Sequence, residues 1–333
     1  MLGVYALYKS CMGGKRKCLL LALAGLLTLV SGCEAKLDLS HVESSKEKPV
    51  ARYDHFQAAA KSASAIVVIG NRGAILTSRD KGESWTRTRL SGDSPISFPT
   101  LVDIEVCPDN HFVILDADRK LWVSDLNGEK WTSKEIPTEE EVLDLTCDHN
   151  GGLWVVGSFT LIMASNDGGD NWSDKSISED AMLSKIQFTD ENHGVVTGEF
   201  GSVYSTNDGG ESWSGGNFIT NEFYAMASHF ISQQKGWVGG LQGIIYQTED
   251  GGRNWQRQET GTRAPIYNFT VFRGNTYAVG EQGTMLVLSG NDWRPVKTEL
   301  GFGYLRAALP LGQDALLIAG GGGLIKRLNQ QDF

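Results

Sequence analysis

A motif of the form Ser/Thr-x-Asp-x-Gly-x-x-Trp recurs along this chain and constrains its fold more than any other feature. The full copies are Ser78/Asp80/Gly82/Trp85, Ser165/Asp167/Gly169/Trp172, Thr206/Asp208/Gly210/Trp213 and Thr248/Asp250/Gly252/Trp255. A degraded copy keeps Ser124, Gly128 and Trp131 but has Leu126 in place of the Asp, and a shortened copy keeps little more than Trp293. A repeat of about 40 residues is typical of propellers and solenoids, in which each unit buries its apolar surface against its neighbours.

The residue types of this motif, the Asp-box, are those of a tight turn. Glycine allows positive φ, while the Asp carboxylate and the Ser/Thr hydroxyl can accept hydrogen bonds from amides of their own loop. The Trp ring can then pack the loop onto the body of the repeat. We therefore interpret these Asp side chains as stabilisers of turns, not as catalytic groups or metal ligands.

Short β-rich runs bounded by glycine predict the second strand of each repeat. These runs are residues 65–69, 112–115, 153–156, 194–197, 236–239, 276–279 and 315–319. No long segment has a helical period. The sequence therefore predicts an all-β, seven-bladed β-propeller over residues 53–333.

A constant spacing predicts how the ring closes. Five of the tryptophans are followed, 13 residues later, by a position near the start of the next inner strand. Counting back 13 residues from the matching Gln57 reaches Ser44. The last repeat has no fourth strand after it, so we expect a strand from Ser44 to Val50, within residues 33–52, to complete the last blade.

The same count predicts a ring of side chains near the mouth of the central channel, because innermost strands line the channel of a propeller. Its members are Gln57, Asp103, Asp144, Lys185, Met226, Asn268 and Arg306. The acids and bases can neutralise each other as a structural plug, since buried charges are normally paired. The alternative, a polar ligand site, stays open.

The Gly-x-x-Gly loops between second and third strands should lie on the same face as that mouth. Their tips, and the loops that lead into the inner strands (which also carry Phe98, Phe223 and Tyr304), present aromatic and arginine side chains. Such side chains are enriched in protein-binding surfaces, although the rings could instead fold back over the channel. The predicted partner-binding residues are Arg72, Arg119, Phe159, Phe200, Tyr224, Tyr267 and Arg306.

The first 32 residues have the features of a signal peptide. Lys15, Arg16 and Lys17 precede an apolar run at residues 18–30, which is too short to span a membrane as a helix. The run ends in Val-Ser-Gly-Cys at 30–33, which resembles a bacterial lipobox and implies cleavage before Cys33 and acylation of its sulfur. An ordinary secretory signal is the alternative, and the start is either Met1 or Met12.

The net charge and the spacing of the histidines argue against several functions. Four of the 30 basic residues but none of the 40 acidic ones lie in the first 32 residues, so the remainder has a formal charge of −14. An acidic protein of this kind is a poor candidate for nucleic-acid binding. The six histidines show no metal-ligand spacing, so we expect neither metal nor cofactor.

For Cys107 and Cys147 we favour two buried thiols, because equivalent atoms of neighbouring blades are usually too far apart for the disulfide that export would allow.

The repeats and the lipobox together resemble the photosystem II stability/assembly factor family. The shared form is Gly-x-x-Gly-x-x-x-x-[Ser/Thr]-x-Asp-Gly-Gly-x-x-Trp, most nearly matched at 203–213, and the resemblance covers nearly the whole mature chain. It implies a non-enzymatic propeller that holds membrane-protein subunits during assembly, partly through a basic patch. The matching loop arginines are Arg72 and Arg119, with Arg306 at the channel.

We therefore expect a lipid-anchored, exported and monomeric scaffold that binds a membrane or envelope protein. Its location would be the periplasmic face of the outer membrane, or the thylakoid lumen if the host is a cyanobacterium. The alternative is a carbohydrate-binding or sialidase-like glycoside hydrolase propeller. Glycosidases other than sialidases need only a pair of carboxylates, for which Asp103 and Asp144 are the candidates. Lys185 beside them would favour both being ionised and so remove the general acid.

Overall fold

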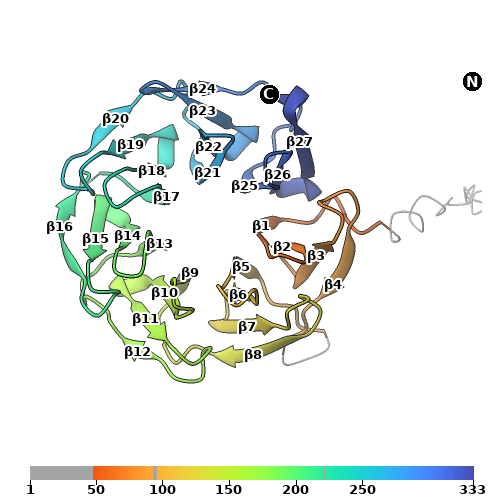
Figure 1. Cartoon of the computed structure of the whole chain (residues 1–333), viewed down its shortest axis with the longest axis horizontal. Coiled ribbons are helices and arrows are strands. Elements are labelled where there is room, and N and C mark those ends of the chain that lie inside the picture. The colour runs from red at the N-terminus through yellow and green to blue at the C-terminus, as the bar shows by residue number, and fades with distance from the viewer. Residues whose placement is uncertain (1–47, 93–95, 221) are drawn as a thin grey trace, which may run out of the picture. The chain divides into compact units, whose positions relative to one another are not determined.

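The structure is a computed structural model that describes residues 48–92, 96–220 and 222–333, of which Pro49–Phe333 form one compact unit. Seven small antiparallel sheets surround a central opening in chain order (Figure 1). Six of them have four strands and the last has three. The predicted all-β, seven-bladed propeller is confirmed. The predicted signal peptide, Cys33 and the tether up to residue 47 lie outside the described residues.

Each blade uses its strands in the order inner, second, third, outer. The inner strands are β1 (Phe56–Lys61), β5 (Leu101–Val106), β9 (Val142–Cys147), β13 (Leu183–Phe188), β17 (Ala225–Phe230), β21 (Ile266–Phe272) and β25 (Leu305–Pro310). The second strands are β2 (Ile66–Gly70), β6 (Phe112–Asp116), β10 (Leu153–Gly157), β14 (Gly194–Gly198), β18 (Gly236–Gly240), β22 (Asn275–Gly280) and β26 (Ala315–Gly320).

The third strands are β3 (Ala74–Ser78), β7 (Lys120–Ser124), β11 (Ile162–Ser165), β15 (Ser202–Thr206), β19 (Ile245–Thr248), β23 (Met285–Ser289) and β27 (Ile325–Asn329). The outer strands are β4 (Thr86–Arg89), β8 (Trp131–Glu135), β12 (Ser173–Asp174), β16 (Ser214–Phe218), β20 (Gln256–Gln258) and β24 (Asp292–Pro295). Single 3-10 turns are η1 (Ser158–Thr160), η2 (Glu199–Gly201), η3 (Leu241–Gly243), η4 (Glu281–Gly283), η5 (Gly321–Gly323) and η6 (Gln330–Asp332). Among the described residues, no helix is long and apolar enough to cross a membrane.

The second strands are buried from end to end, apart from the first residue of β22. Each lies in the middle of its sheet, and both faces of each sheet pack against neighbouring blades. A strand covered on both faces needs a continuous apolar run instead of alternation. This requirement explains why the glycine-bounded runs located the blades so well.

The hydrophobic core is divided among the junctions between blades. At most junctions the Asp-box tryptophan of one blade contacts the second strand of the preceding blade. Trp213 lies 6.1 Å from Trp154 between ring centroids, and Trp293 lies 6.4 Å from Trp237. Trp131 and Trp172 pack in the corresponding clusters of the earlier junctions. The tryptophan of each motif therefore joins two blades, in addition to covering its own loop.

Trp255 differs from three other motif tryptophans in its indole N–H, since the buried indole N–H groups of Trp131, Trp172 and Trp213 have no hydrogen-bond partner among the described residues. The ring of Trp255 packs against the preceding blade in the usual way, in the cluster of Val195, which is the position in β14 that corresponds to Trp154. The aromatic contact of Trp255 is with Phe230 of its own blade, at 6.2 Å between ring centroids. Its indole N–H donates to the carbonyl of Gly252 in its own loop at 3.0 Å. The full copies of the motif therefore differ in the hydrogen bonding of the indole N–H, although their turns are alike.

Phe333 takes the place of the tryptophan at the junction of the last two blades. Its ring lies 5.5 Å from Tyr277 of β22 and 5.6 Å from Phe272 of β21. Tyr277 is the second-strand residue that corresponds to Trp154 and Trp237 in the strand registers. The ring of Phe333, which follows β27, thus fills the place at this junction that a motif tryptophan takes at the others.

The junction between the last blade and the first is closed by packing and by a few polar contacts. Phe56, Leu317 and Trp85 share one apolar cluster, to which Val50 is added. The amide of Gly323 donates to the carbonyl of Asp54 at 2.8 Å. The predicted closing strand falls mainly on residues outside the described part of the chain, and Lys48–Val50, which are described, form bends instead of a strand.

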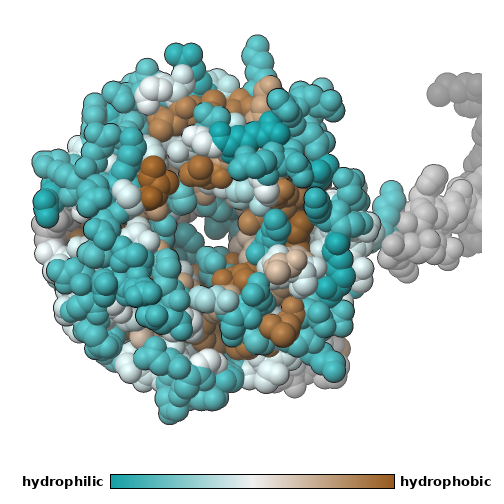
Figure 2. All heavy atoms as spheres, viewed as in Figure 1, coloured by the Kyte–Doolittle hydropathy of each residue, from teal (hydrophilic) through white to brown (hydrophobic). Residues whose placement is uncertain are grey.

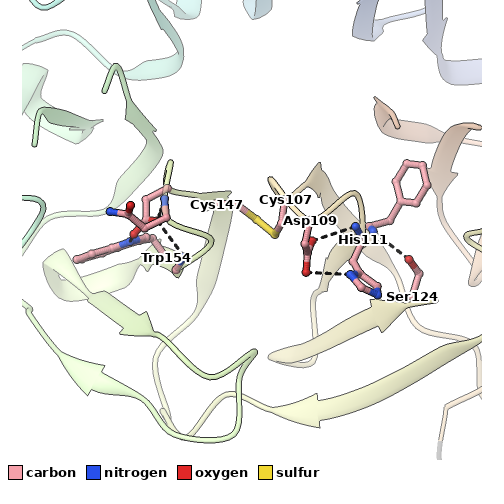
Figure 3. The surroundings of a disulfide bond; sticks show 10 residues. Cys107, Asp109, His111, Ser124, Cys147 and Trp154 are labelled. Atoms are coloured by element: carbon pink, nitrogen blue, oxygen red, sulfur yellow. Dashed lines mark hydrogen bonds and ion pairs between the residues drawn. A yellow bond between two sulfur atoms is a disulfide. The ribbon is translucent and has the colours of Figure 1, made fainter. Parts of the chain in front are cut away.

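A disulfide joins Cys107 and Cys147, so the expectation of two buried thiols was wrong (Figure 3). Cys107 directly follows β5, and Cys147 ends β9. The inner strands of adjacent blades converge at the channel, and the two Cα atoms are only 5.3 Å apart. That separation is within the range for a disulfide. Cys147 corresponds to Val106 and not to Cys107 in the strand registers, so the spacing of equivalent atoms in neighbouring blades does not apply to this pair.

Replacing Phe333 with Ala should lower the free energy of unfolding by about 1–2 kcal/mol, less than for a fully buried Phe because the ring is 41% exposed. Urea unfolding measures the change. Phe302→Ala, at a position 92% exposed, is the matched control and should have almost no effect. An equal loss in both variants would contradict the role of Phe333 as a joint between blades.

Replacing both cysteines with serine should destabilise the ring by up to about 4 kcal/mol, because the disulfide closes a loop with a sequence separation of 40 residues. Reduction of the disulfide in the wild type should lower the free energy of unfolding by the same amount. Urea unfolding with and without a reductant measures this change. The double serine variant is the control, since its stability should not respond to the reductant. An unchanged wild type after complete reduction would contradict the prediction.

Candidate functional site

The two ends of the ring carry different loops. We call the end with the Gly-x-x-Gly loops the loop face, and the opposite end, with the Asp-box loops, the box face. The strand order places the entry into each inner strand on the loop face as well. In the space-filling view the ring is open at its centre, with apolar side chains gathered around the opening and a mostly hydrophilic periphery (Figure 2).

The Asp-box side chains on the box face bond to their own loops. Asp208 accepts hydrogen bonds from the hydroxyl of Thr206 at 2.7 Å and from the amide of Ser212 at 3.0 Å. The hydroxyl of Thr206 in turn accepts the amide of Gly210 at 2.8 Å. Bonds of this kind, above all from the side chain of Ser212, lower the pKa of Asp208 to about 2. The same bonds recur at Asp80, Asp167 and Asp250. This geometry is that of a stapled turn.

A β-bulge interrupts every inner strand at the same place, close to the loop face. The register shifts fall between Phe56/Ala58, Leu101/Asp103, Val142/Asp144, Leu183/Lys185, Ala225/Ala227, Ile266/Asn268 and Leu305/Ala307. A bulge leaves one residue unpaired and redirects its side chain. Two consecutive positions therefore supply the wall of the channel mouth in five of the seven inner strands, and β17 and β25 supply one position each.

The structure brings all seven residues of the predicted ring together around one cavity of about 100 Å³. They do not occupy equivalent positions, as the count of 13 residues assumed. Gln57, Met226 and Arg306 are the unpaired residues of their bulges, while Asp103, Asp144, Lys185 and Asn268 are the next, paired residues. The ring is therefore staggered. The lining is completed by Ala58 and by four further bulge residues, Val102, Leu143, Ser184 and Tyr267.

Three carboxyl groups and one lysine form the wall on the second to fourth blades. Lys185 is in direct contact with Asp144, and its Nζ lies 3.9 Å from Asp103. Burial opposes the charge of Lys185, but Asp144 and Asp103 raise its pKa above the ordinary value. Burial also raises the pKa of Asp144 well above its usual range, with Lys185 opposing and Asp103 adding to the shift. Lys185 itself therefore favours the ionised form of Asp144, as expected, whereas burial opposes that form.

Glu105 is the third carboxyl group, and sequence reasoning missed it. It lies two residues beyond Asp103 on the same strand, and therefore on the same side. Burial and the charge of Asp103 raise the pKa of Glu105 to about 7, against a smaller opposing effect of Lys185. Period-two alternation along residues 101–106 was the signal that could have found it.

The tips of the loop face have left-handed backbone. Arg72, Arg119, Phe159, Phe200, Gln242 and Gln282 have φ between 53° and 63°, and Gly322 takes the seventh position with φ 69°. Side chains other than Gly and Asn rarely adopt this conformation, and it costs energy. The loops therefore present arginine and aromatic side chains at their tips, although the left-handed backbone at these residues lowers the stability of the fold.

The predicted partner-binding residues come one from each blade and share the loop face, without forming a single cluster. Phe159 and Phe200 are 57% and 41% exposed, so their rings do not fold back into the channel. Phe200 contacts Tyr224, at 5.7 Å between ring centroids, and Arg306 lies over Tyr267. Phe223, expected in the same loops, is instead buried in a junction between blades.

These features define the class of the protein: a seven-bladed β-propeller with Asp-box repeats, whose candidate site is the loop face and the channel mouth. A family model described as photosynthesis system II assembly factor YCF48 matches residues 123–184 and 177–271. The predicted resemblance to the photosystem II stability/assembly factor family is therefore confirmed. No curated protein matches the sequence.

Similar solved structures support the fold. YCF48 from Cyanidioschyzon merolae is 18% identical with a TM-score of 0.58, covering 70% of this chain and 82% of that one. A structure of YCF48 bound to a D1 peptide is 16% identical with a TM-score of 0.58, covering 70% and 76%. Virginiamycin B lyase from Staphylococcus aureus is 12% identical with a TM-score of 0.70, covering 84% and 96%. At these identities the likeness concerns the fold alone.

The contribution of Glu105 to the free energy of unfolding should fall as the pH rises from about 5 to about 8. The folded state keeps the proton of Glu105 up to a pKa of about 7, whereas the unfolded state releases it near the ordinary value of 4.5. Glu105→Gln should therefore raise the melting temperature more at pH 8 than at pH 5. Thermal unfolding across this pH range measures the effect. Glu222→Gln, an exposed substitution on the loop face, is the control, and equal pH profiles for both variants would contradict the assignment.

Proposed function

We propose that this protein is a non-enzymatic assembly factor that holds a segment of a membrane or envelope protein on its loop face. Two comparisons support the proposal: the match to the photosystem II assembly factor family, and the similar fold of a YCF48 structure with a bound D1 peptide. A segment of a photosystem subunit is accordingly the first candidate for the bound chain.

The distribution of exposed aromatic side chains carries the proposal. Six of the seven large aromatic residues that are exposed in the described part of the chain lie on loops or strand ends of the loop face. They are Tyr53, Phe159, Phe200, Phe218, Tyr224 and Phe302, whereas the seventh is Phe333. Exposed apolar surface concentrated on one face marks an interaction site, and aromatic residues dominate the binding energy of such sites.

Two loop-tip arginines add a charge that a partner can use. The guanidinium of Arg72 lies 5.7 Å from the ring centroid of Tyr53, and that of Arg119 donates to the carbonyl of Glu139 at 2.9 Å. Neither has a carboxylate within 4 Å among the described residues. Both can pair with acidic groups of a bound segment through strong charge-assisted hydrogen bonds.

The geometry of the channel favours a binding protein over a glycoside hydrolase. Asp144 is only 2% exposed, and its two oxygens are occupied by Lys185 and by the amide of Ile186 at 2.8 Å. A substrate oxygen could not reach a carboxyl group held in this way, although the general acid of a glycosidase must do so. Asp103 and Asp144 are better explained as groups that join inner strands.

The location is part of the proposal. Acylation at Cys33 would anchor the chain, and the 16 residues from Cys33 to Pro49 reach at most ~55 Å. The described chain enters the ring beside Gly323, at the loop face. A monomer tethered on this side would keep its loop face close to the membrane, at the outer membrane or, in a cyanobacterium, in the thylakoid lumen.

A photo-crosslinker placed at position 200 in intact cells should give one dominant adduct with a membrane protein. The matched control is position 231 on the box face, where Ile231 is 51% exposed. Phe159→Ser combined with Phe200→Ser should reduce binding of the partner, or of the D1 peptide as a first probe, at least tenfold, whereas Ile231→Ser should not. Equal adducts at both positions, or unchanged binding by the double variant, would contradict the proposal.

A further inference from the structure

Arg306 occupies a position in the channel mouth that differs from all other arginines of the loop face. It is the unpaired residue of the bulge in β25, so its side chain is directed to the cavity and not to a neighbouring blade. Its guanidinium carbon lies 4.5 Å from the ring centroid of Tyr267 and 6.0 Å from that of Tyr304. Stacking on aromatic faces leaves the N–H groups at the edge of the guanidinium available.

The two tyrosines that flank Arg306 are themselves fixed. The hydroxyl of Tyr267 donates to Glu281 at 2.8 Å. The hydroxyl of Tyr304 lies 3.1 Å from Nδ1 of His55 and 3.4 Å from Nε2 of Gln57 on the first blade. Three consecutive blades of the ring therefore hold the guanidinium in one place. Such preorganisation reduces the entropy lost when a ligand binds.

The positive charge of Arg306 has no ion-pair partner among the described residues. The channel lysine, Lys185, is by contrast in contact with Asp144 and close to Asp103. Glu281 accepts the hydroxyl of Tyr267, and it forms no ion pair with Arg306. A half-buried cation that is rigid and unpaired calls for an anion from outside the chain.

We propose that the channel mouth is a carboxylate-binding site in which the guanidinium of Arg306 pairs with both oxygens of the ligand. The cavity of about 100 Å³ admits a small organic acid or the terminal carboxylate of a peptide, but not a whole folded segment. One guanidinium matches one carboxylate in a bidentate pair. Asp103 and Asp144, which line the same cavity, disfavour a dianion such as phosphate. This site does not depend on the partner-binding role of the loop face.

The first test uses the full-length protein with N-acetylglycine and with its neutral analogue N-acetylglycinamide. Calorimetry should detect binding of the acid and none of the amide. Arg306→Gln should weaken binding of the acid at least tenfold, and Arg306→Lys should restore part of the affinity, because it keeps the charge but loses the planar fork. Tyr267→Leu, which keeps the arginine but removes the stacked ring, should also weaken binding.

Arg273→Gln is the matched control, since Arg273 also lies over an aromatic ring, that of Phe272 at 5.2 Å, but outside the channel mouth. It should bind N-acetylglycine as the wild type does. Acetyl-Ala-Phe-Ala with a free or an amidated terminus identifies the source of the carboxylate. A free tripeptide that binds at least tenfold more tightly than N-acetylglycine indicates a chain terminus, and equal affinities indicate a small acid.

The proposal is overturned if acids and amides bind equally, if no acid binds, or if Arg306→Gln and Tyr267→Leu leave the affinity of the acids unchanged. Failure of the crosslink at position 200 would leave these expectations intact, because that experiment probes the exposed rings and not the channel. The two proposals can therefore fail separately.

Discussion

No backbone ladder connects one blade to the next in the described part of the chain, so the ring depends on side chains that cross between blades. Part of this connection is apolar, through the aromatic residues at the junctions. Part is polar and lies at the channel, where each inner strand is the edge of its sheet. Gln187 both donates to and accepts from the backbone of Phe230, at 2.8 and 2.9 Å, and Asn268 donates to the carbonyl of Arg306 at 2.9 Å. These bonds satisfy edge groups that would otherwise be costly to bury.

Because some channel side chains hold the blades together, the polar groups of the channel fall into two kinds: those used to join strands and those free to bind a ligand. The side chains of Asp144 and Gln187 use their oxygens or nitrogens to join strands, so they cannot also serve a ligand. Arg306 contributes only its backbone carbonyl to such a bond, and its guanidinium keeps its donors. Most polar side chains of the channel thus serve to join the inner strands and keep the ring closed. Similar propellers include a lyase, which illustrates that the fold alone does not set the chemistry.

Local chemistry explains what could be predicted from the sequence. The Asp-boxes could be recognised from the sequence because their hydrogen bonds, such as those of Thr206, Asp208 and Gly210, form within a single loop. The disulfide was missed because the approach of Cys107 to Cys147 depends on how two blades converge, which no local pattern records.

The channel ring was predicted in its membership but not in its geometry. Its stagger was missed because a bulge changes the register by one residue without changing the spacing from the tryptophans. Glu105 was overlooked because only one residue per strand was counted.

The left-handed loop tips have a consequence for how this protein could change over time. A side chain at Phe159 or Phe200 points away from the ring and contributes little to the packing of the blades, so its identity is set by what it meets outside. Glycine would relieve the backbone at these positions, as it does at Gly322. Each tip can therefore be exchanged independently, and a new binding preference could arise from single substitutions while the scaffold below stays the same.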